Sequence, residues 1–392
     1  LRSREDLFEI FINPLEWGQT SWMHEVDSER EWIDQTIEKT IAFIQSGGNT
    51  DVSLQVTIPN EWDNSIAKTN IGFTAGIETT QVAHQWIERG NIMDGIIVVS
   101  NHAKSVYENT EYIAKNEATG DEVEFKLTTP VSVANYPAKV FTDLPELDLE
   151  LDHDFNFLTI AQFGPRKNLP NTVKWFVEEF QNEEVGFVVK TNLAKNSYID
   201  REQVFHQMRA FLQQYPNRKC KVYLLHGDLY DDEIHSLYKH PKINAMVTMT
   251  HGEGFGLPIF EAAYSGLPTI CPGWSGQLDF LVDKNGASKF YNVEYDIGAI
   301  PDKVVWDGVL IKESGWAYAR EHSAKQQMRR CYSELTSENG PEILKTFEDY
   351  AAEIHEEFSD EKRNADFVSS LCMYAGISTE VAETREILLD LG

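Results

Sequence analysis

The sequence predicts an α/β protein built from two doubly wound domains. Short apolar runs recur along the 392 residues, and most are followed by a segment with the apolar spacing of a helix. This alternation indicates strands joined by helices, which is the pattern of a parallel sheet covered on both faces. The alternation stops once, at residues 141–156, and then starts again. A chain of this length accommodates two such units.

The first series of elements occupies the N-terminal part of the chain. Its strand candidates are residues 8–12, 52–58, 71–74 and 96–99. Apolar side chains three or four positions apart predict a helix over 32–44. A second helix is expected at 79–89, and Ser100 or Asn101 is placed to cap a third that runs towards Tyr107.

A linker separates this series from the next one. Residues 141–156 are acidic and carry no sustained periodicity, which is typical of a connection between domains. The second series of strand candidates comprises 157–161, 185–189, 222–225, 245–250 and 269–270. We therefore expect domains at 1–148 and 149–340, followed by C-terminal helices at 341–392.

The composition limits the classes of partner. A formal net charge of −29 disfavours binding of nucleic acid or of an anionic membrane surface, so an anionic ligand needs a local positive pocket. The four cysteines form no Cys-x-x-Cys pair, which indicates neither a disulfide framework nor a zinc site. The sequence shows no basic-plus-apolar leader and no apolar run near about 18 residues, so we expect a cytoplasmic protein without an integral membrane segment.

Residues 251–261 are the strongest candidate for a functional site. Three glycines alternate with other residues ahead of Pro258, which suits the first turn of a helix expected at 259–264. Glycines let backbone N–H groups approach a ligand, and a helix N-terminus favours negative charge, so the stretch predicts a phosphate site. Glu253 and Glu261 bracket it, and carboxylates accept hydrogen bonds from hydroxyls. A sugar nucleotide combines both features.

Glu261 by itself has an ordinary structural explanation, because acidic residues are common in the first turns of helices. The whole unit is more specific. The strand expected at 245–250 leads into it, and residues 266–270 indicate another strand directly after the helix.

Glu253 and Glu261, with Gly-Phe-Gly-Leu-Pro between them, resemble the Glu-x7-Glu motif of retaining glycosyltransferases of the GT-B fold, most closely glycosyltransferase family 4. The resemblance implies that Glu253 lies beside the donor sugar and that Glu261 holds the ribose hydroxyls. It also implies that the backbone of the intervening residues meets the donor diphosphate: Gly254, Phe255, Gly256 and Leu257.

The resemblance further implies a complete architecture and activity. Two Rossmann-like domains would face each other across a cleft, with a last helix crossing back to the N-terminal domain. The enzyme would transfer a hexose from a UDP- or GDP-sugar to a hydroxyl of a glycan or glycoconjugate, as in polysaccharide biosynthesis. It would retain the anomeric configuration and use neither a metal nor another cofactor.

Three cations are candidates for holding the donor. Arg166 and Lys167 follow the first strand of the second domain, at the strand end where ligands bind in α/β folds. The resemblance assigns them to the diphosphate, although relatives often carry the arginine earlier, near Gln162. Lys190 ends the next strand and is a donor-binding candidate, with an ordinary surface lysine as the alternative. Gly18 matches a glycine loop that closes over the donor in the family.

The acceptor side departs from the family pattern. Relatives place a histidine after the strand that we expect at 71–74, whereas this chain has Glu78 in that region. The nearest histidine, His84, lies inside an expected helix and is interpreted as a helix-face residue. After the strand that follows Glu261, Ser275 is placed either to line the sugar site or to cap a helix.

The sequence leaves three alternatives to a transferase to compare. A non-catalytic GT-B subunit that binds a nucleotide or glycan, or a GT-B sugar-nucleotide epimerase, would share the same fold. A dinucleotide-dependent dehydrogenase is disfavoured, because no expected strand is followed by Gly-x-Gly-x-x-Gly with an acidic residue about 20 residues further on.

Overall fold

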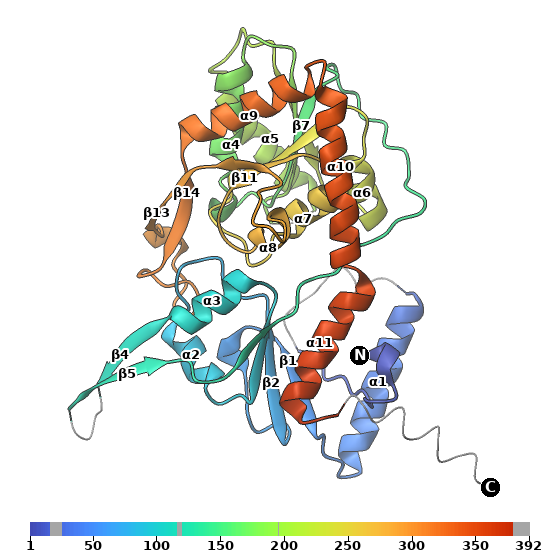
Figure 1. The fold of residues 1–392 in the computed structure, drawn as a ribbon, viewed down its shortest axis with the longest axis vertical. Helices are drawn as coiled ribbons and strands as arrows, with labels where there is room; N and C mark the ends of the chain where they lie inside the picture. Colours follow the sequence, from blue (N-terminus) through green and yellow to red (C-terminus); the bar gives the residue numbers. More distant parts are fainter. Residues whose placement is uncertain (16–25, 116–119, 195, 379–392) are drawn as a thin grey trace.

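The computed structural model describes residues 1–15, 26–115, 120–194 and 196–378, and it contains two parallel sheets stacked along the long axis of the molecule (Figure 1). The lower sheet has four strands in the order β1 (Val52–Val56), β2 (Thr69–Thr74), β3 (Gly95–Val98) and β6 (Val131–Val133). Its helices are α1 (Ser28–Gln45), α2 (His84–Gly90) and α3 (Asn101–Asn109), with 3-10 turns η1 (Arg2–Arg4) and η3 (Pro59–Glu61). A hairpin of β4 (Glu111–Lys115) and β5 (Glu122–Lys126) projects from this half.

The upper sheet has six parallel strands in the order β12-β11-β10-β7-β8-β9. Their bounds are β7 (Asn156–Ile160), β8 (Gly186–Thr191), β9 (Lys221–His226), β10 (Ile243–Val247), β11 (Thr269–Pro272) and β12 (Tyr291–Val293). The helices of this half are α4 (Leu169–Phe180), α5 (Tyr198–Leu212), α6 (Asp231–Tyr238), α7 (Leu257–Tyr264), α8 (Leu278–Leu281) and α9 (Glu321–Leu335). An antiparallel pair, β13 (Tyr295–Ala299) and β14 (Gly315–Ala319), and the turns η4 (Pro165–Lys167) and η5 (Asp302–Val304) complete it.

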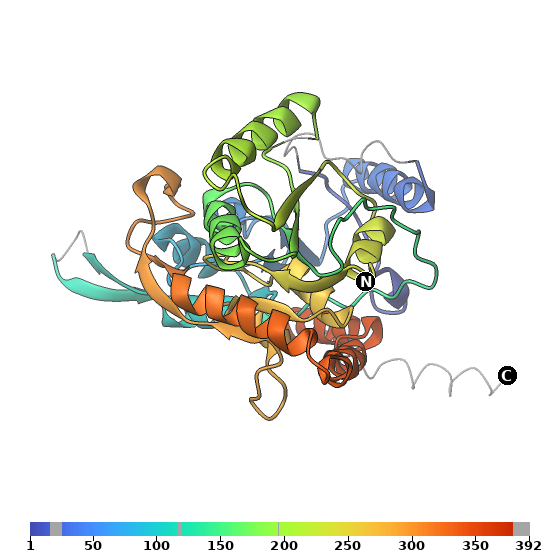
Figure 2. The same cartoon turned by 90° about the horizontal axis from the view of Figure 1, so that it is seen from above.

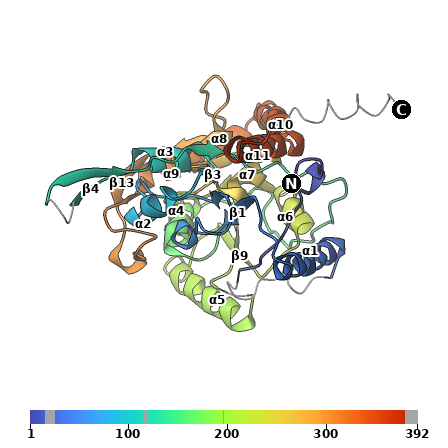
Figure 3. The ribbon, with the colours of Figure 1, turned by 90° about the horizontal axis from the view of Figure 1, so that it is seen from below.

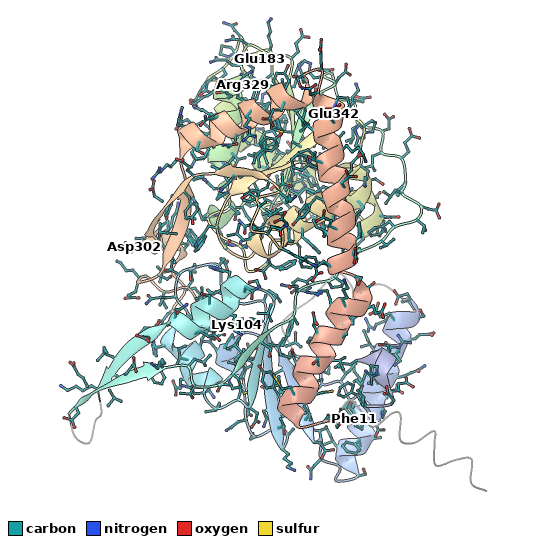
Figure 4. All side chains as sticks on the ribbon, in the orientation of Figure 1. Phe11, Lys104, Glu183, Asp302, Arg329 and Glu342 are labelled. Carbon is teal, nitrogen blue, oxygen red and sulfur yellow. The ribbon has the colours of Figure 1, made fainter. Side chains whose placement is uncertain are left out.

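Helices cover both faces of the upper sheet, as Figure 2 shows from above. The reason is visible in β8, where every side chain is buried. Phe187 and Val189 join a core with α4, α5 and α9, whereas Val188 joins a second core with α6 and α7. Because successive strand residues point to opposite faces, a strand apolar at every position requires cover on both sides. At the top of the molecule Arg329 of α9 anchors this helix to α4 through Glu179, at 2.7 Å, and Glu183 (Figure 4).

Two C-terminal helices connect the halves. α10 (Gly340–Glu357) packs against α7 of the upper half, and α11 (Asp360–Ala375) runs down to the lower sheet. There the Phe367 ring meets Phe73 of β2 edge-on at 5.7 Å, and the Tyr374 hydroxyl is 2.6 Å from Ser132 Oγ of β6. Seen from below, both helices lie on the side of the molecule opposite α5 (Figure 3).

The halves touch directly where strands of both sheets end. Ser100 Oγ, after β3, donates to the carbonyl of Gly254 at 2.5 Å, and the Asn101 amide donates to Asp279 at 2.9 Å. Thr80, after β2, exchanges two hydrogen bonds with Gly315. The expected arrangement of two facing domains is therefore present, and at these points the facing surfaces are in contact.

Most expected strands are confirmed within one to three residues, and residues 134–155 contain no strand or helix, as expected for a linker. The strand expected at 8–12 is wrong: this segment packs on α1, and its Ile12 amide donates to Thr40 rather than to a strand. The helix expected at 79–89 begins only at His84, because Thr80 is bonded to the opposite half.

The cysteines and the lengths of the helices can be compared with the expectations from the sequence. All four cysteines are buried and free. Among the described helices, none is both long enough and apolar enough to cross a bilayer.

Candidate active site

The glycine-rich stretch connects β10 to α7, as the spacing of Gly256 and Pro258 predicts. Gly256 adopts a φ of 98°, which is accessible chiefly to glycine, and Pro258 lies in the first turn of α7. The amides of Gly254, Phe255 and Gly256 donate to no described residue. Free N–H groups at a helix N-terminus are chemically suited to hydrogen-bonding an anion.

The other glycines are required by close approach of the two halves. A Cβ atom on Gly254 would lie 2.5 Å from the carbonyl oxygen of Ala75, on the loop after β2. A Cβ atom on Gly252 would collide with the carbonyl of Glu78 and with the Trp274 ring. Any side chain at either position would push the halves apart.

Four charged side chains meet beside this loop. Lys167 Nζ lies 2.6 Å from Glu253 Oε1, and Arg166 Nη1 lies 3.0 Å from Glu253 Oε2. Arg166 also contacts the lower half, with its Nε 2.7 Å from Glu78 Oε1. The structure thus brings the three expected catalytic residues together and adds Glu78, which comes from the opposite half.

The pKa directions in this cluster follow from burial and charge. Burial favours the neutral acid at Glu253, but Lys167 and Arg166 outweigh it and hold the pKa of Glu253 below its ordinary value. Burial opposes the charge on Arg166, yet Glu253 and Glu78 raise its pKa. Burial lowers the pKa of Lys167, in the same direction as the neighbouring Arg166 and against the attraction of Glu253. Arg166 and Lys167 therefore compensate the charge of the buried Glu253 carboxylate.

Backbone strain in the described residues concentrates at this site. Asn168 and Ser275 are the only described non-glycine residues with positive φ, at 51° and 79°. Asn168 directly follows Lys167, and Ser275 Oγ accepts the Glu253 amide at 2.9 Å while donating to Gln277 at 2.8 Å. Ser275 therefore orients Glu253 and does not cap α8, whose N-cap is Gln277. Strained residues held in this way are typical of functional sites.

Glu261 occupies a different environment on α7. Its carboxylate accepts from the Tyr238 hydroxyl at 3.0 Å, and burial raises its pKa, opposed by that hydrogen bond and by Lys139. Lys139, on the segment between the sheets, forms an ion pair with Asp231 at the start of α6. Residues 253–261, which comprise the glycine loop and the first turns of α7, form one loop-and-helix unit. Glu253 and Glu261 lie at its two ends.

The other four expected donor residues have different surroundings. Phe255 is 3% exposed and packs on Phe260 and Phe280, so its side chain is not available to a ligand. Leu257 is exposed at the start of α7. Lys190 is buried and donates to the Gly227 carbonyl after β9 instead of joining the four-charge cluster. Gly18 lies outside the described residues.

Two histidines of the lower half, His84 and His102, have different positions relative to the upper half. His84 is a helix-face residue on α2, as expected, with its ring 6.1 Å from that of Tyr112. His102, which the sequence analysis did not single out, lies in the first turn of α3 and packs its ring against Trp274 of the upper half. Its position just after β3 is the available signal, because residues after parallel strands face the ligand-binding edge.

No group of three or more His, Cys, Asp or Glu side chains in the described ranges is arranged to hold a metal ion. The charge-neutralising groups that the described structure offers beside the glycine loop are Arg166 and Lys167.

Comparison with known proteins adds evidence on the fold. No protein-family model matches the chain, and no curated protein sequence does. Among solved structures, a glycosyltransferase from Rickettsia africae is similar with a TM-score of 0.54 and 12% identity, over 90% of this chain and 84% of that one. A structure described as trehalose-6-phosphate from E. coli bound with UDP-2-fluoro glucose has a TM-score of 0.55 and 9% identity, over 86% and 75%.

A third similar structure is the pneumococcal O-GlcNAc transferase GtfA in complex with UDP and GlcNAc, with a TM-score of 0.51 and 14% identity. The alignment covers 87% of this chain but only 60% of that transferase. Identities this low carry information on architecture alone. With two parallel α/β halves and helices that connect them, the chain has the GT-B fold.

Proposed function

We propose that this protein is a retaining glycosyltransferase that moves a sugar from a UDP- or GDP-sugar to a hydroxyl group of a glycan or glycoconjugate. The observation that carries the proposal is the buried carboxylate of Glu253 held by Lys167 and Arg166, beside three amides that donate to no described residue. In a chain of net charge −29, Lys167, Arg166 and these amides are the groups at this loop that suit an anionic ligand.

The diphosphate, the ribose and the sugar of a sugar nucleotide each have a matching group in this arrangement. The diphosphate lies against the amides of Gly254, Phe255 and Gly256, with Lys167 and Arg166 as countercharges. The ribose hydroxyls donate to Glu261, and the sugar lies beside Glu253. Glu78, which reaches the cluster from the lower half, belongs to the acceptor wall.

The anomeric configuration is retained because the acceptor oxygen attacks the anomeric carbon on the same face from which the diphosphate departs. The bond between the anomeric carbon and the phosphate oxygen breaks, the acceptor oxygen bonds to that carbon, and the acceptor proton passes to the phosphate oxygen. Lys167 and Arg166 stabilise the negative charge that builds on the diphosphate, and Glu253 stabilises the positive charge on the sugar. These residues supply the electrostatic role without a metal ion. Contact between the halves excludes water, which limits hydrolysis.

The comparisons support the donor class at a coarse level. The E. coli and pneumococcal structures contain a UDP-sugar analogue and UDP, respectively. Those ligands belong to those proteins, and they make UDP and its sugars the first donors to test here.

A calorimetric panel of UDP, GDP, ADP and their sugars tests the proposal most directly. We expect one nucleotide to bind, its sugar to be hydrolysed slowly by the purified protein, and the released or transferred sugar to keep its anomeric configuration in NMR spectra. Absence of binding across the panel would contradict the donor class. Binding without hydrolysis or transfer would favour the non-catalytic alternative, and an inverted anomer would exclude retention.

A further inference from the structure

We propose that His251 is a positioning residue that sets the spacing between Glu253 and the loop that carries Glu78. It acts through the free edge of β14, which is the edge that faces away from β13. The inference rests on the proposed function only for the reaction that it affects.

The free edge of β14 presents the peptide groups of Gly315 and Ala317. In an antiparallel pair, residues two positions apart direct their N–H and C=O groups to the same side. Gly315 and Ala317 lie opposite Ala299 and Ile297 of β13, yet their amides donate to residues outside this pair. At these two positions β14 therefore binds further segments.

Each of the two positions binds one wall of the candidate site. Gly315 donates to Thr80 Oγ1 at 2.8 Å, and its carbonyl accepts the Thr80 amide at 3.1 Å. Ala317 donates to the His251 carbonyl at 3.0 Å, and its own carbonyl accepts from His251 Nδ1 at 2.8 Å. Because a carbonyl only accepts hydrogen bonds, Nδ1 carries the proton. The His251 side chain thus completes the pair of bonds that a neighbouring strand would otherwise supply.

The two bound residues are close in sequence to the charged cluster. Thr80 follows Glu78 by two residues, and His251 precedes Glu253 by two residues. Two residues of a strand span about 7 Å, so the free edge of β14 fixes the separation of the two loops. The His251 amide also donates to the Arg166 carbonyl at 2.8 Å. His251 therefore holds the start of the glycine loop against the Arg166 loop and against β14.

Packing holds the His251 ring in addition to its hydrogen bond. His251 is buried, and the rings of Trp316 and Tyr318, which flank Ala317, have centroids 5.4 and 4.5 Å from its own. Burial lowers the pKa of His251, while the bond to Ala317 opposes this shift and Arg166 adds to it. The ring is therefore uncharged at neutral pH and donates from Nδ1 without adding a charge to the cluster.

Loss of the ring donor would weaken this connection at one end. The Ala317 carbonyl belongs to a fully buried residue, and a buried acceptor without a donor is unfavourable. The pairs of Glu253 with Lys167 and Arg166 do not involve β14 and would remain. We expect the contact between Glu78 and Arg166, which joins the two halves, to loosen first.

The first test measures hydrogen exchange and does not depend on activity. Exchange of the amides in residues 251–256 and 315–319 would be compared in the wild type, His251→Leu and His251→Asn. Leucine has no donor, whereas the asparagine amide nitrogen reproduces the Nδ1–H donor. We expect exchange about fivefold faster or more in both segments of His251→Leu, as for one lost hydrogen bond, and near wild-type exchange in His251→Asn.

His153→Leu is the matched control for the exchange experiment. His153 Nε2 is 3.2 Å from the Lys219 carbonyl, and both residues precede strands of the upper sheet, β7 and β9. They therefore lie at the sheet edge opposite the glycine loop, which follows β10. This variant should leave exchange in both segments unchanged. Equal exchange in the wild type and His251→Leu would overturn the inference.

The second test combines kinetics with a double-mutant cycle. His251→Leu should lower kcat by about 10- to 100-fold, as expected for a misplaced group, with a smaller change in the nucleotide Kd, and His251→Asn should restore most of kcat. Thr80→Val removes the acceptor of the Gly315 amide at the other contact of the free edge and should also lower kcat. The combined loss should be smaller than the product of the two, because both variants disturb one spacing. A combined loss equal to the product, or wild-type kcat in His251→Leu, would overturn the inference.

These outcomes separate the two proposals. If no nucleotide binds the wild type, the proposed function fails, while the exchange experiment still decides the role of His251. Nucleotide binding with independent variants leaves the proposed function standing and removes His251 from it. If His251→Leu melts at a much lower temperature than the wild type, His251→Asn is compared instead with His251→Gln, which places its amide nitrogen near the Nε2 position. Equal exchange in those two variants would then overturn the inference.

Discussion

Glu253 and Glu261 lie eight positions apart on one loop-and-helix unit, yet their surroundings differ completely. Glu253 is buried between two cations, and its pKa is lowered. Glu261 is half-buried, its hydrogen-bond partner is the neutral hydroxyl of Tyr238, and its pKa is raised. The same residue type is therefore tuned in opposite directions at the two ends of the unit.

The different neighbours of Glu253 and Glu261 explain why the pKa values of these two side chains shift in opposite directions. Lys167 and Arg166 come from the loop after β7, and Tyr238 comes from α6. Pairs of acids whose surroundings separate their pKa values are common where two carboxylates have different tasks. A carboxylate kept ionised suits stabilisation of positive charge, and one that accepts a neutral hydroxyl suits binding of sugar hydroxyls. Four predictions test this division.

The largest effect is expected for Glu253→Gln. Removing the charge leaves Lys167 and Arg166 buried beside each other, which should cost on the order of 3 kcal/mol of unfolding free energy. Turnover should fall by about 100-fold or more, because the positive charge on the sugar loses its countercharge. Denaturant unfolding and steady-state kinetics measure the two effects.

Glu178→Gln is a matched control for that variant. Glu178 forms an ion pair with Lys325 at 2.7 Å and accepts from Tyr215, both away from the glycine loop. We expect a smaller loss of stability and unchanged turnover. Equal kinetic losses in both variants would show that Glu253 acts through folding alone.

Lys167→Ala should lower turnover more than donor binding. The lysine stabilises charge that grows as the diphosphate leaves, so kcat should fall by about tenfold or more while the calorimetric Kd of the nucleotide changes less. Lys190→Met provides the comparison, because Lys190 is engaged by the Gly227 carbonyl and should affect both quantities less. Normal turnover in Lys167→Ala would place the diphosphate elsewhere.

Glu261→Ala should act on binding rather than on turnover. Loss of the hydrogen bonds to the ribose should weaken nucleotide affinity by roughly 1 kcal/mol or more, with kcat at saturating donor nearly unchanged. Calorimetry with the nucleotide identified in the panel measures the change. Unchanged affinity would remove the ribose role from Glu261.

The smallest effect is expected in the pH dependence of nucleotide affinity, to which Glu261 should contribute and Glu253 should not. The raised pKa of Glu261 means that the folded protein keeps this proton above the ordinary value of 4.5. Its contribution to stability is therefore present at low pH and lost as pH rises through the folded pKa. The ionised form is the better acceptor of ribose hydroxyls, so nucleotide affinity should rise over the same interval.

Glu253 should behave in the opposite way. Its lowered pKa keeps it ionised across that interval, and the stability that it contributes is lost only as pH falls through its folded pKa. Calorimetry as the pH rises above 4.5 should therefore show a slope in the wild type and a flatter profile in Glu261→Gln. An unchanged slope in that variant would assign the titration to another group.

Local pattern predicted much of this architecture. Alternation of apolar runs predicted β1 to β3 and β7 to β11 because a strand buried on both faces must be largely apolar, and this property is visible in consecutive residues. It did not predict the short edge strands β6 and β12. The start of α7 followed in the same way from Gly256 and Pro258. The segment at 8–12 failed because an apolar run does not reveal whether it pairs with a strand or packs on a helix.

By itself the sequence determined the two doubly wound halves, the glycine loop with its two acids, and the adjacent cations Arg166 and Lys167. Only the tertiary structure decided that both cations meet Glu253, that Glu78 reaches Arg166 from the other half, and that His102 packs against Trp274. The physical reason is separation along the chain. Periodicity and capping act over a few residues, whereas charge pairing and burial depend on segments that are distant in sequence and adjacent only after folding.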